Sequence, residues 1–210
     1  RAVAKFAATT SATFIRNQIS NIALCDQWNV GLVRAPIARF LEPDFVPEVE
    51  WFADDRGPDH YLADPFPLLR GGSLGVLAED YDYQRRIGTI ARLDFGDMSR
   101  TTVDIGSESH ASYPYTFEHD ATAYVAAQIT GQQGVSLLKI DDKGDLAPGG
   151  RLDLDAEALD PTLFEHDGRW WLFFTRPGAQ SLTELHIWWA DELFGEWKPH
   201  ALNPVKTDIR

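Results

Sequence analysis

Two aspartates at equivalent points of a repeated sequence pattern have the residue type and the spacing for acid–base chemistry. Asp64 and Asp160 each precede a proline and begin the aligned segments 64–79 and 160–175. Hydrolysis of a glycosidic bond requires two facing carboxyl groups, one protonated and one ionised, about 5–5.5 Å apart for retention or about 6.5–9.5 Å apart for inversion. Asp64 and Asp160 supply such a pair if the repeats bring them to one pocket. An aspartate before proline also commonly fixes a turn, so a purely structural role stays open for both.

Glu79 is the third candidate carboxyl group. It ends an apolar run and is followed directly by Asp80. Adjacent residues of a strand point to opposite faces, so at most one of the two faces the pocket, and we predict that it is Glu79. The equivalent residue of the aligned segment 113–128 is Gln128. An amide cannot act as a general acid, which weakens the case for hydrolysis.

The histidines of the repeats have both functional and structural interpretations. His110 lies on a predicted loop before the second copy, where a ligand contact and an exposed or core histidine are equally expected. His119 and His166 occupy matching turn positions and are predicted to be turn residues on the outer face. No set of His, Asp and Cys has the spacing of a closed metal site, so we expect no metal. We expect no other cofactor, because the motifs of nucleotide-binding loops, serine hydrolases and zinc proteases are missing.

An internal repeat indicates the fold that must position these side chains. The aligned segments 64–79, 113–128 and 160–175 have prolines at 65, 114 and 161, which are 49 and 47 residues apart. A period of about 40–50 residues with short strands and turn residues is typical of propeller blades, each a four-stranded sheet. Each copy is predicted to be a hairpin, and the third carries an Asp-Gly turn signal. The innermost strand of each blade borders the axial channel, so equivalent residues converge there.

The remaining segments fit the outer strands of such blades. Residues 86–93, 135–140 and 185–190 are predicted to be half-buried strands, and no long helical periodicity follows residue 25. We therefore expect an all-β fold in which residues 64–205 form about three four-stranded blades. Residues 28–52 are expected to be flanking strands from a preceding, incomplete blade.

The predicted arc of blades should have open ends. Closed propellers typically have four to eight blades, so about three blades cannot close a ring and should leave an exposed edge. Four aromatic residues are expected to lie at these open ends, where only the further sheets of a closed ring would cover them: Trp28, Trp51, Trp188 and Trp197.

Composition and charge make several classes of partner poor candidates. The 210 residues include 19 Lys and Arg against 32 Asp and Glu, a formal charge of −13, so we expect neither nucleic acid nor an anionic membrane surface as a partner. The single cysteine, Cys25, cannot form an internal disulfide, and no apolar run reaches the ~18 residues of a membrane span. These features permit a cytoplasmic location, which is our expectation.

The N-terminal region is expected to be distinct from the propeller. The chain begins at Arg1 and its only methionine is Met98, which we interpret as a piece of a longer protein. Residues 1–25 contain no acid and have the composition of a transit peptide, but the spacing of their apolar residues favours packing against a domain. We predict a linker or docking segment at residues 1–27 and a partial β-propeller domain at residues 28–210.

Short motifs spread over residues 28–205 resemble a known family. They are Trp28-Asn29-Val30-Gly31, Ala63-Asp64-Pro65-Phe66, Glu79-Asp80-Tyr81-Asp82-Tyr83, His110-Ala111-Ser112-Tyr113-Pro114, Asp160-Pro161-Thr162-Leu163-Phe164, Gly168-Arg169-Trp170-Trp171-Leu172-Phe173 and Gly195-Glu196-Trp197-Lys198-Pro199-His200. Together they look like the N-terminal domain of glucosamine inositolphosphorylceramide transferases and of its bacterial relatives. That domain is similar to the five-bladed propellers of glycoside hydrolase families 43 and 62. The resemblance therefore implies a glycosidase-like β-propeller with a carbohydrate-sized axial pocket.

The resemblance also implies roles for the candidate residues. Asp64 matches the aspartate base of the hydrolases, whereas Tyr113 and Asp160 stand where those enzymes have a second aspartate and a glutamate acid. Two of the three roles are altered, which favours binding over hydrolysis. The candidate catalytic residues are Asp64, Glu79 and Asp160. The residues expected to bind the sugar are His110, Tyr113 and Trp28.

The expected function is that of a carbohydrate-binding, glycosidase-like propeller domain, accessory to a glycosyltransferase or another sugar-modifying domain. This expectation follows from the resemblance, because in the plant proteins the similar domain lies beside a separate glycosyltransferase domain. The expected partners are a carbohydrate or glycoconjugate and a fused or separate transferase domain. The alternative is an active glycoside hydrolase that uses paired carboxylates in the axial pocket, so both an enzyme and a binding domain stay open at this point.

Overall fold

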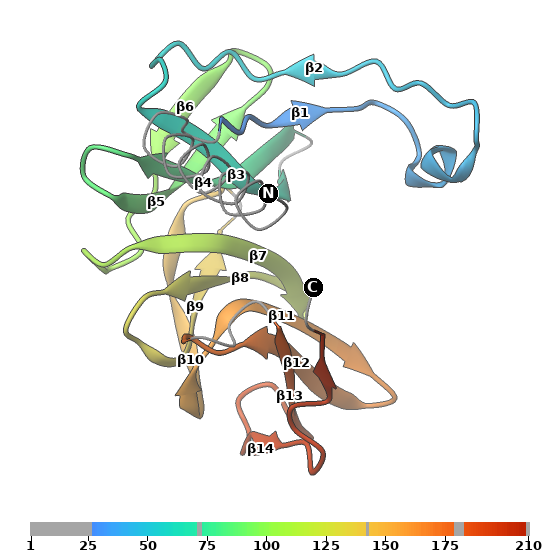
Figure 1. The fold of residues 1–210 in the computed structure, drawn as a ribbon, viewed down its shortest axis with the longest axis vertical. Coiled ribbons are helices and arrows are strands. Elements are labelled where there is room, and N and C mark those ends of the chain that lie inside the picture. Colours follow the sequence, from blue (N-terminus) through green and yellow to red (C-terminus); the bar gives the residue numbers. More distant parts are fainter. Residues whose placement is uncertain (1–26, 71–72, 142, 179–182, 209–210) are drawn as a thin grey trace, which may run out of the picture.

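The chain forms three successive antiparallel β-sheets and a small N-terminal hairpin (Figure 1). The computed structural model describes residues 27–70, 73–141, 143–178 and 183–208. Residues 1–26 of the predicted linker or docking segment lie outside the described residues. Within the described part of the chain, no helix is long and apolar enough to cross a membrane.

Each of the three sheets consists of consecutive strands in chain order, as in a propeller blade. The first blade comprises β3 (His60–Arg70), β4 (Ser73–Asp82), β5 (Ile87–Asp94) and β6 (Ser99–Thr102). The second comprises β7 (Ala111–His119), β8 (Thr122–Ile129), β9 (Gln133–Ile140) and β10 (Leu146–Glu157). The third comprises β11 (Leu159–His166), β12 (Arg169–Thr175), β13 (Glu184–Ala190) and β14 (Lys198–Pro199), and β15 (Lys206–Thr207) also pairs with β13. The predicted three four-stranded blades are confirmed.

Two of the inner hairpins close with two-residue turns in which both residues have positive φ. They are Asp120-Ala121, with φ of 48° and 57°, and Asp167-Gly168, with φ of 52° and 68°. This is the type I′ geometry, whose twist matches that of the flanking strands. The predicted Asp-Gly turn is confirmed, and His119 and His166 are the strand residues that flank these turns.

The blades pack face to face through apolar side chains at equivalent positions. Leu77 of the first blade and Val125 of the second share one buried core cluster. Ala126 of the second blade and Leu172 of the third, at the equivalent positions, share the next. The pattern repeats from one seam to the next because adjacent strand residues alternate between the two faces of each sheet. These seams fix the blades around a common axis.

Two of the four tryptophans expected at the open ends lie instead inside the chain. Trp188 and Trp197 are only 7% and 5% exposed and belong to the core cluster between the second and third blades. The prediction was wrong for them because Trp188 pairs with Leu172 across the sheet and so shares its inward face. Trp28 and Trp51 are 63% and 60% exposed, as expected of residues without a covering sheet.

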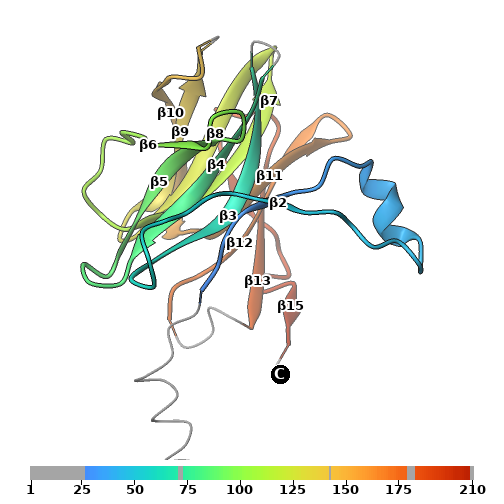
Figure 2. The same cartoon turned by 90° about the horizontal axis from the view of Figure 1, so that it is seen from above.

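The N-terminal hairpin covers the free face of the first blade at its base and then extends away from it. Its elements are β1 (Gly31–Leu32), the 3₁₀ helix η1 (Ile37–Leu41) and β2 (Glu50–Trp51). Val30 and Phe52 pack into the core cluster on that face. Figures 1 and 2 show the distal part of the hairpin projecting from the blades. Residues 28–52 are thus a short hairpin and not the strands of a preceding blade.

Candidate functional site

The first strand of each blade has a β-bulge at the same point of the repeat. The bulged residues are Asp64, Tyr113 and Asp160, whose φ angles are 49°, 48° and 53°. A positive φ strains a residue other than glycine, at a cost of about 1–3 kcal/mol, and such residues cluster at functional sites. Bulges also re-aim side chains and are over-represented next to active sites. The repeat therefore presents three strained residues at equivalent points of three blades.

The carboxyl groups of Asp64, Glu79 and Asp160 form an acidic cluster. Burial, followed by the charges of Asp64 and Asp160, raises the pKa of Glu79 to about 7. Burial and the charge of Asp64 also raise the pKa of Asp160. The three predicted catalytic residues, from the first and third blades, are thus close enough for their charges to act on one another.

Hydrogen bonds between blades anchor the bulged residues of the cluster. The Asp64 carboxylate accepts a hydrogen bond from the backbone N–H of Tyr113. Burial raises the pKa of Asp64, and this hydrogen bond offsets part of that rise. Gln128 Oε1 accepts the backbone N–H of Asp160 at 2.9 Å. Asp64 therefore does bind a backbone N–H, but that N–H belongs to the next blade and not to its own turn. Gln128, which cannot act as an acid, positions Asp160.

Asp80 lies on the other face of β4 and does not join the acidic cluster. Its carboxylate pairs with Arg56, and with Arg100 at 3.4 Å. Arg56 also pairs with Asp54 at 2.8 Å, and its hydrogen bond to Asp54 lowers the pKa of that carboxyl group. Of the two adjacent acids, Glu79 is therefore the one beside Asp64, while Asp80 stabilises the segment that leads into β3.

His110 faces the acidic cluster from the loop before β7. Gly88 donates its backbone N–H to His110 Nδ1 at 2.8 Å, and His110 Nε2 lies 3.7 Å from Glu79 Oε1. Burial lowers the pKa of His110. Of the three residues expected to bind sugar, His110 therefore approaches the acidic cluster with its side chain, whereas Tyr113 contacts it through its backbone N–H.

The Tyr113 side chain and the Trp28 residue make contacts outside the acidic cluster. The Tyr113 hydroxyl is 2.9 Å from Thr162 Oγ1, and its ring meets Phe66 edge to face at a centroid distance of 4.9 Å. Tyr113 therefore ties the second blade to the first and third. The Trp28 carbonyl accepts the N–H of Leu62, while its side chain is exposed. Trp28 is thus near the start of β3 and available to solvent.

A group of tyrosines next to Glu79 was not predicted from the sequence. Tyr61 and Tyr81 stack with ring centroids 4.8 Å apart, and Tyr83 meets both edge to face at 5.4 and 5.2 Å. Burial, followed by the charge of Glu79, raises the pKa of Tyr61. The signal was present in the chain, because Glu79 and Tyr81 are two residues apart in β4 and so share one face of the strand, and Tyr83 follows directly after its end. We call Tyr61, Tyr81 and Tyr83 the tyrosine group.

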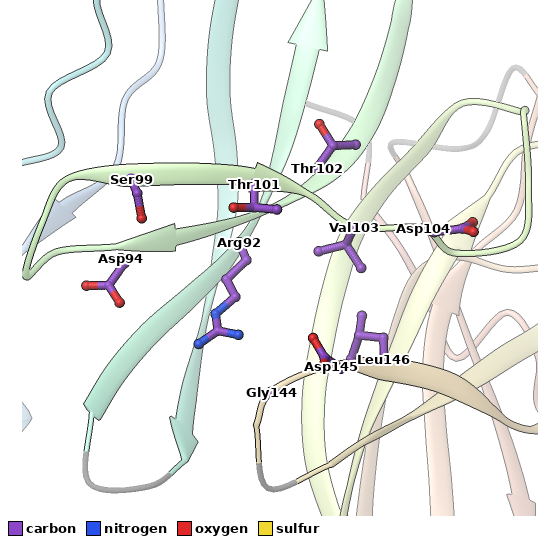
Figure 3. A pocket seen from close by; sticks show the side chains of 10 residues that line it. All are labelled: Arg92, Asp94, Ser99, Thr101, Thr102, Val103, Asp104, Gly144, Asp145 and Leu146. Carbon is purple, nitrogen blue, oxygen red and sulfur yellow. The ribbon is translucent and has the colours of Figure 1, made fainter.

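A separate cavity of about 490 Å³ lies between the outer strands of the first blade and the second blade (Figure 3). Arg92 reaches across this seam and donates to the Lys143 carbonyl at 3.1 Å. Val103 and Leu146 point toward each other across the cavity. None of the six predicted site residues lines it. Among the described residues, no group of three or more His, Cys, Asp and Glu could hold a metal ion.

Comparison with protein families and full-length relatives gives one consistent match. Residues 47–210 match the family described as glucosamine inositolphosphorylceramide transferase 1, N-terminal. The chain is 28% identical over 155 residues to glucosamine inositolphosphorylceramide transferase 1 of Oryza sativa subsp. japonica, covering 70% of this chain and 21% of the relative. It is 26% identical over 166 residues to the Arabidopsis thaliana protein of that name, covering 76% and 22%. The chain therefore spans about a fifth of the length of these relatives.

Comparison with solved structures identifies the fold. A β-1,3-galactosidase of glycoside hydrolase family 43 with galactodeoxynojirimycin has a TM-score of 0.53 at 12% identity, covering 73% of this chain and 64% of that one. A family 117 glycoside hydrolase of Zobellia galactanivorans has a TM-score of 0.55 at 16% identity, covering 74% and 60%. At such identities the likeness shows the fold alone. The chain has the all-β architecture of the five-bladed glycosidase propellers, and the predicted fold class is confirmed.

Proposed function

The chain belongs to the family of the N-terminal domain of glucosamine inositolphosphorylceramide transferase 1, and from that premise we propose that it is a carbohydrate-binding domain. The site is the acidic cluster together with the tyrosine group. The domain is accessory to a sugar-transferring domain, fused to it or associated with it, and its ligand is a carbohydrate or a glycoconjugate.

The observation that carries this proposal is the meeting of Asp64, Glu79 and Asp160 beside stacked tyrosines. Carboxylate oxygens accept hydrogen bonds from sugar hydroxyl groups, and an aromatic ring offers a flat apolar face with a polar edge. Ligand sites generally combine aromatic walls with a few convergent polar groups. A sugar ring, with polar edges and less polar faces, matches both halves of the site.

The accessory role is supported by the lengths of the relatives. Both plant proteins carry the word transferase in their names, and the region similar to this chain is about a fifth of each. The rest of such a protein offers room for a separate catalytic domain. A binding domain of this kind would hold the glycoconjugate that the transferase domain modifies.

A second candidate function, glycoside hydrolysis, is favoured by one observation. Burial and the charges of nearby acids raise the pKa of Glu79 to about 7, and the charge of Asp64 is among those that act on it. A protonated and an ionised carboxyl group in one site are the two groups that glycosidases use. Against it, the equivalent bulge position of the second blade is Tyr113, and Gln128 replaces an acid beside it.

The test is a glycan array probed with the 210-residue chain, followed by incubation with chromogenic glycosides. Binding without release of chromophore is the result expected of an accessory domain. Release of chromophore that is lost in Glu79→Gln would instead support the hydrolase. An Asp94→Asn variant, changed at the cavity of Figure 3, is the control that should keep both properties of the wild-type chain. Absence of binding and of release would overturn both.

A further inference from the structure

The hydrogen bond from Gly88 to His110 fixes where the imidazole ring carries its proton. A backbone N–H can only donate, and Gly88 donates to Nδ1 at 2.8 Å. Nδ1 must therefore be the unprotonated nitrogen, and the neutral ring carries its hydrogen on Nε2. That Nε2–H lies on the side of Glu79, whose Oε1 is 3.7 Å away.

This arrangement is possible because residue 88 is a glycine. A Cβ atom placed on Gly88 would lie 2.3 Å from Glu79 Oε1 and 2.9 Å from His110 Cε1. It would also lie 2.8 Å from the backbone carbonyl oxygen of Ala111, which cannot move aside without shifting β7. Gly88, Glu79 and His110 therefore meet at a point where only glycine leaves both side chains in place.

We propose that His110 is a positioning residue, locked by the Gly88 N–H in its neutral Nε2–H form, which orients Glu79 and leaves the exchangeable proton of the acidic cluster on Glu79. The proposal rests on the proposed function in treating this cluster as the ligand site. It assigns His110 a role through Glu79 instead of a direct contact with sugar.

The physical reason lies in what protonation of His110 would require. An imidazolium has hydrogens on both nitrogens, so its Nδ1–H would oppose the Gly88 N–H and the hydrogen bond would be lost. A histidine beside several carboxylates ordinarily gains a proton before they do, because its charge compensates theirs. Here the Gly88 N–H opposes that outcome, and the buried surroundings of His110 act in the same direction. The negative charge of the cluster is then relieved by protonating Glu79.

The charged groups around Glu79 favour protonation of its carboxylate. Asp64 from β3 and Asp160 from β11 face it with like charge, and Tyr61 from β3 is neutral. Asp80, on the opposite face of β4, is paired with arginines, and its charge is the third that raises the pKa of Glu79. No arginine or lysine is among the charges that shift the pKa of Glu79. Around His110, the contacting side chains that titrate are Glu79 and Tyr81.

The direct test is an NMR titration of the full 210-residue chain without any sugar. Long-range ¹H–¹⁵N correlation reports the tautomer and protonation of His110, and ¹³C carboxyl shifts report Glu79. The signals are assigned by their loss in His110→Gln and Glu79→Gln. We expect His110 to stay in the Nε2–H form while Glu79 titrates near neutral pH. An Nδ1–H tautomer, or an imidazolium that forms while Glu79 stays ionised, would overturn the proposal.

Variants at residue 110 separate positioning from space filling. His110→Phe keeps a buried ring but removes the N–H that favours the ionised carboxylate, so Glu79 should bind its proton about threefold more tightly. His110→Gln places an amide N–H near the former Nε2 and should restore the wild-type titration. Equal titration of Glu79 in wild type and in the Phe variant would overturn the proposal. His166→Gln, at an exposed turn, is the control that should leave Glu79 unchanged.

The outcome does not depend on whether a sugar binds. If the titration behaves as expected but no glycan binds, the proposed function fails and the role of His110 in holding Glu79 stands. If glycans bind but His110 carries the proton, the proposed function stands and the positioning role fails.

Discussion

Asp64 in the first blade accepts a hydrogen bond from the backbone N–H of Tyr113, the residue at the equivalent point of the second blade. The same carboxylate raises the pKa values of Glu79 and Asp160. Asp64 therefore holds a seam between blades and also supplies charge to the acidic cluster. Substitutions at Asp64 can separate these two contributions.

Asp64→Asn should weaken sugar binding while leaving the melting temperature nearly unchanged. The amide oxygen can still accept the Tyr113 N–H, but the charge is lost. Asp64→Ala also removes the acceptor and should lower the melting temperature by about 2–4 °C, the effect of about 1 kcal/mol in a chain of this size. Thermal melts and calorimetric titration with a glycan found on the array measure both. A clear loss of stability in Asp64→Asn with unchanged binding would mean that the residue is purely structural.

Gly88→Ala should destabilise the chain and disturb the acidic cluster. The added methyl group would approach Glu79 Oε1 and the Ala111 carbonyl closely, and overpacking of this kind costs about 1–3 kcal/mol. The matched control is Gly75→Ala in the same blade, where the nearest atoms to a Cβ are 3.7 and 3.8 Å away. Urea denaturation of both variants compares them, and equal stabilities would contradict the close approach at Gly88.

The stability of Glu79→Gln relative to wild type should depend on pH. The Glu79 pKa is raised from 4.5 to about 7 on folding, so the folded chain binds this proton more tightly than the unfolded chain does. The contribution of this proton to the stability of the wild-type chain is complete below pH 4.5 and is lost as the pH rises through 7. Glutamine is neutral at every pH. The free energy of unfolding of the variant should therefore rise relative to that of wild type by up to about 3 kcal/mol between acidic and mildly alkaline pH.

Denaturation curves of both proteins across that range measure the difference, in which the titration of the other groups cancels. A difference that stays constant with pH would show that the Glu79 carboxyl has an ordinary pKa in the folded chain.

Asp80→Ala should destabilise the chain by about 3 kcal/mol, because it leaves the partly buried Arg56 and Arg100 without one of their two carboxylate partners. Asp155→Ala is the control, since its ion pair with Arg176 is long and exposed and such pairs contribute little. Urea denaturation at pH 7 compares the two. A small effect in both variants would mean that Asp54 alone satisfies the arginines.

The repeat in the sequence was sufficient to predict the three blades and the equivalent positions of Asp64 and Asp160 in the first and third of them. The repeat is informative because equivalent residues of successive blades face the same axis, so residues one repeat apart in the sequence lie on the same side of their blades. Strand alternation likewise identified Glu79, and not Asp80, as the acid beside Asp64.

Other features depend on contacts that no local pattern records. Trp188 is buried between two blades because of the register of β13 on β12, which the sequence period does not specify. The ion pairs between Asp80 and Arg56 join a loop to a strand across the sheet. Gly88 looks like an ordinary strand glycine until Glu79 and His110 are placed around it.

Amide chemical-shift mapping of a glycan titrated into the ¹⁵N-labelled chain tests most directly whether the acidic cluster is the ligand site. The glycan is one retained on the array, and the reporters are two amides bonded within the proposed site. The Gly88 N–H donates to His110 and the Tyr113 N–H donates to Asp64. Binding at the acidic cluster predicts saturable shifts at Gly88 and Tyr113 and none at Gly144, which lines the cavity of Figure 3. Shifts that gather at Gly144 and leave Gly88 and Tyr113 unmoved would contradict it.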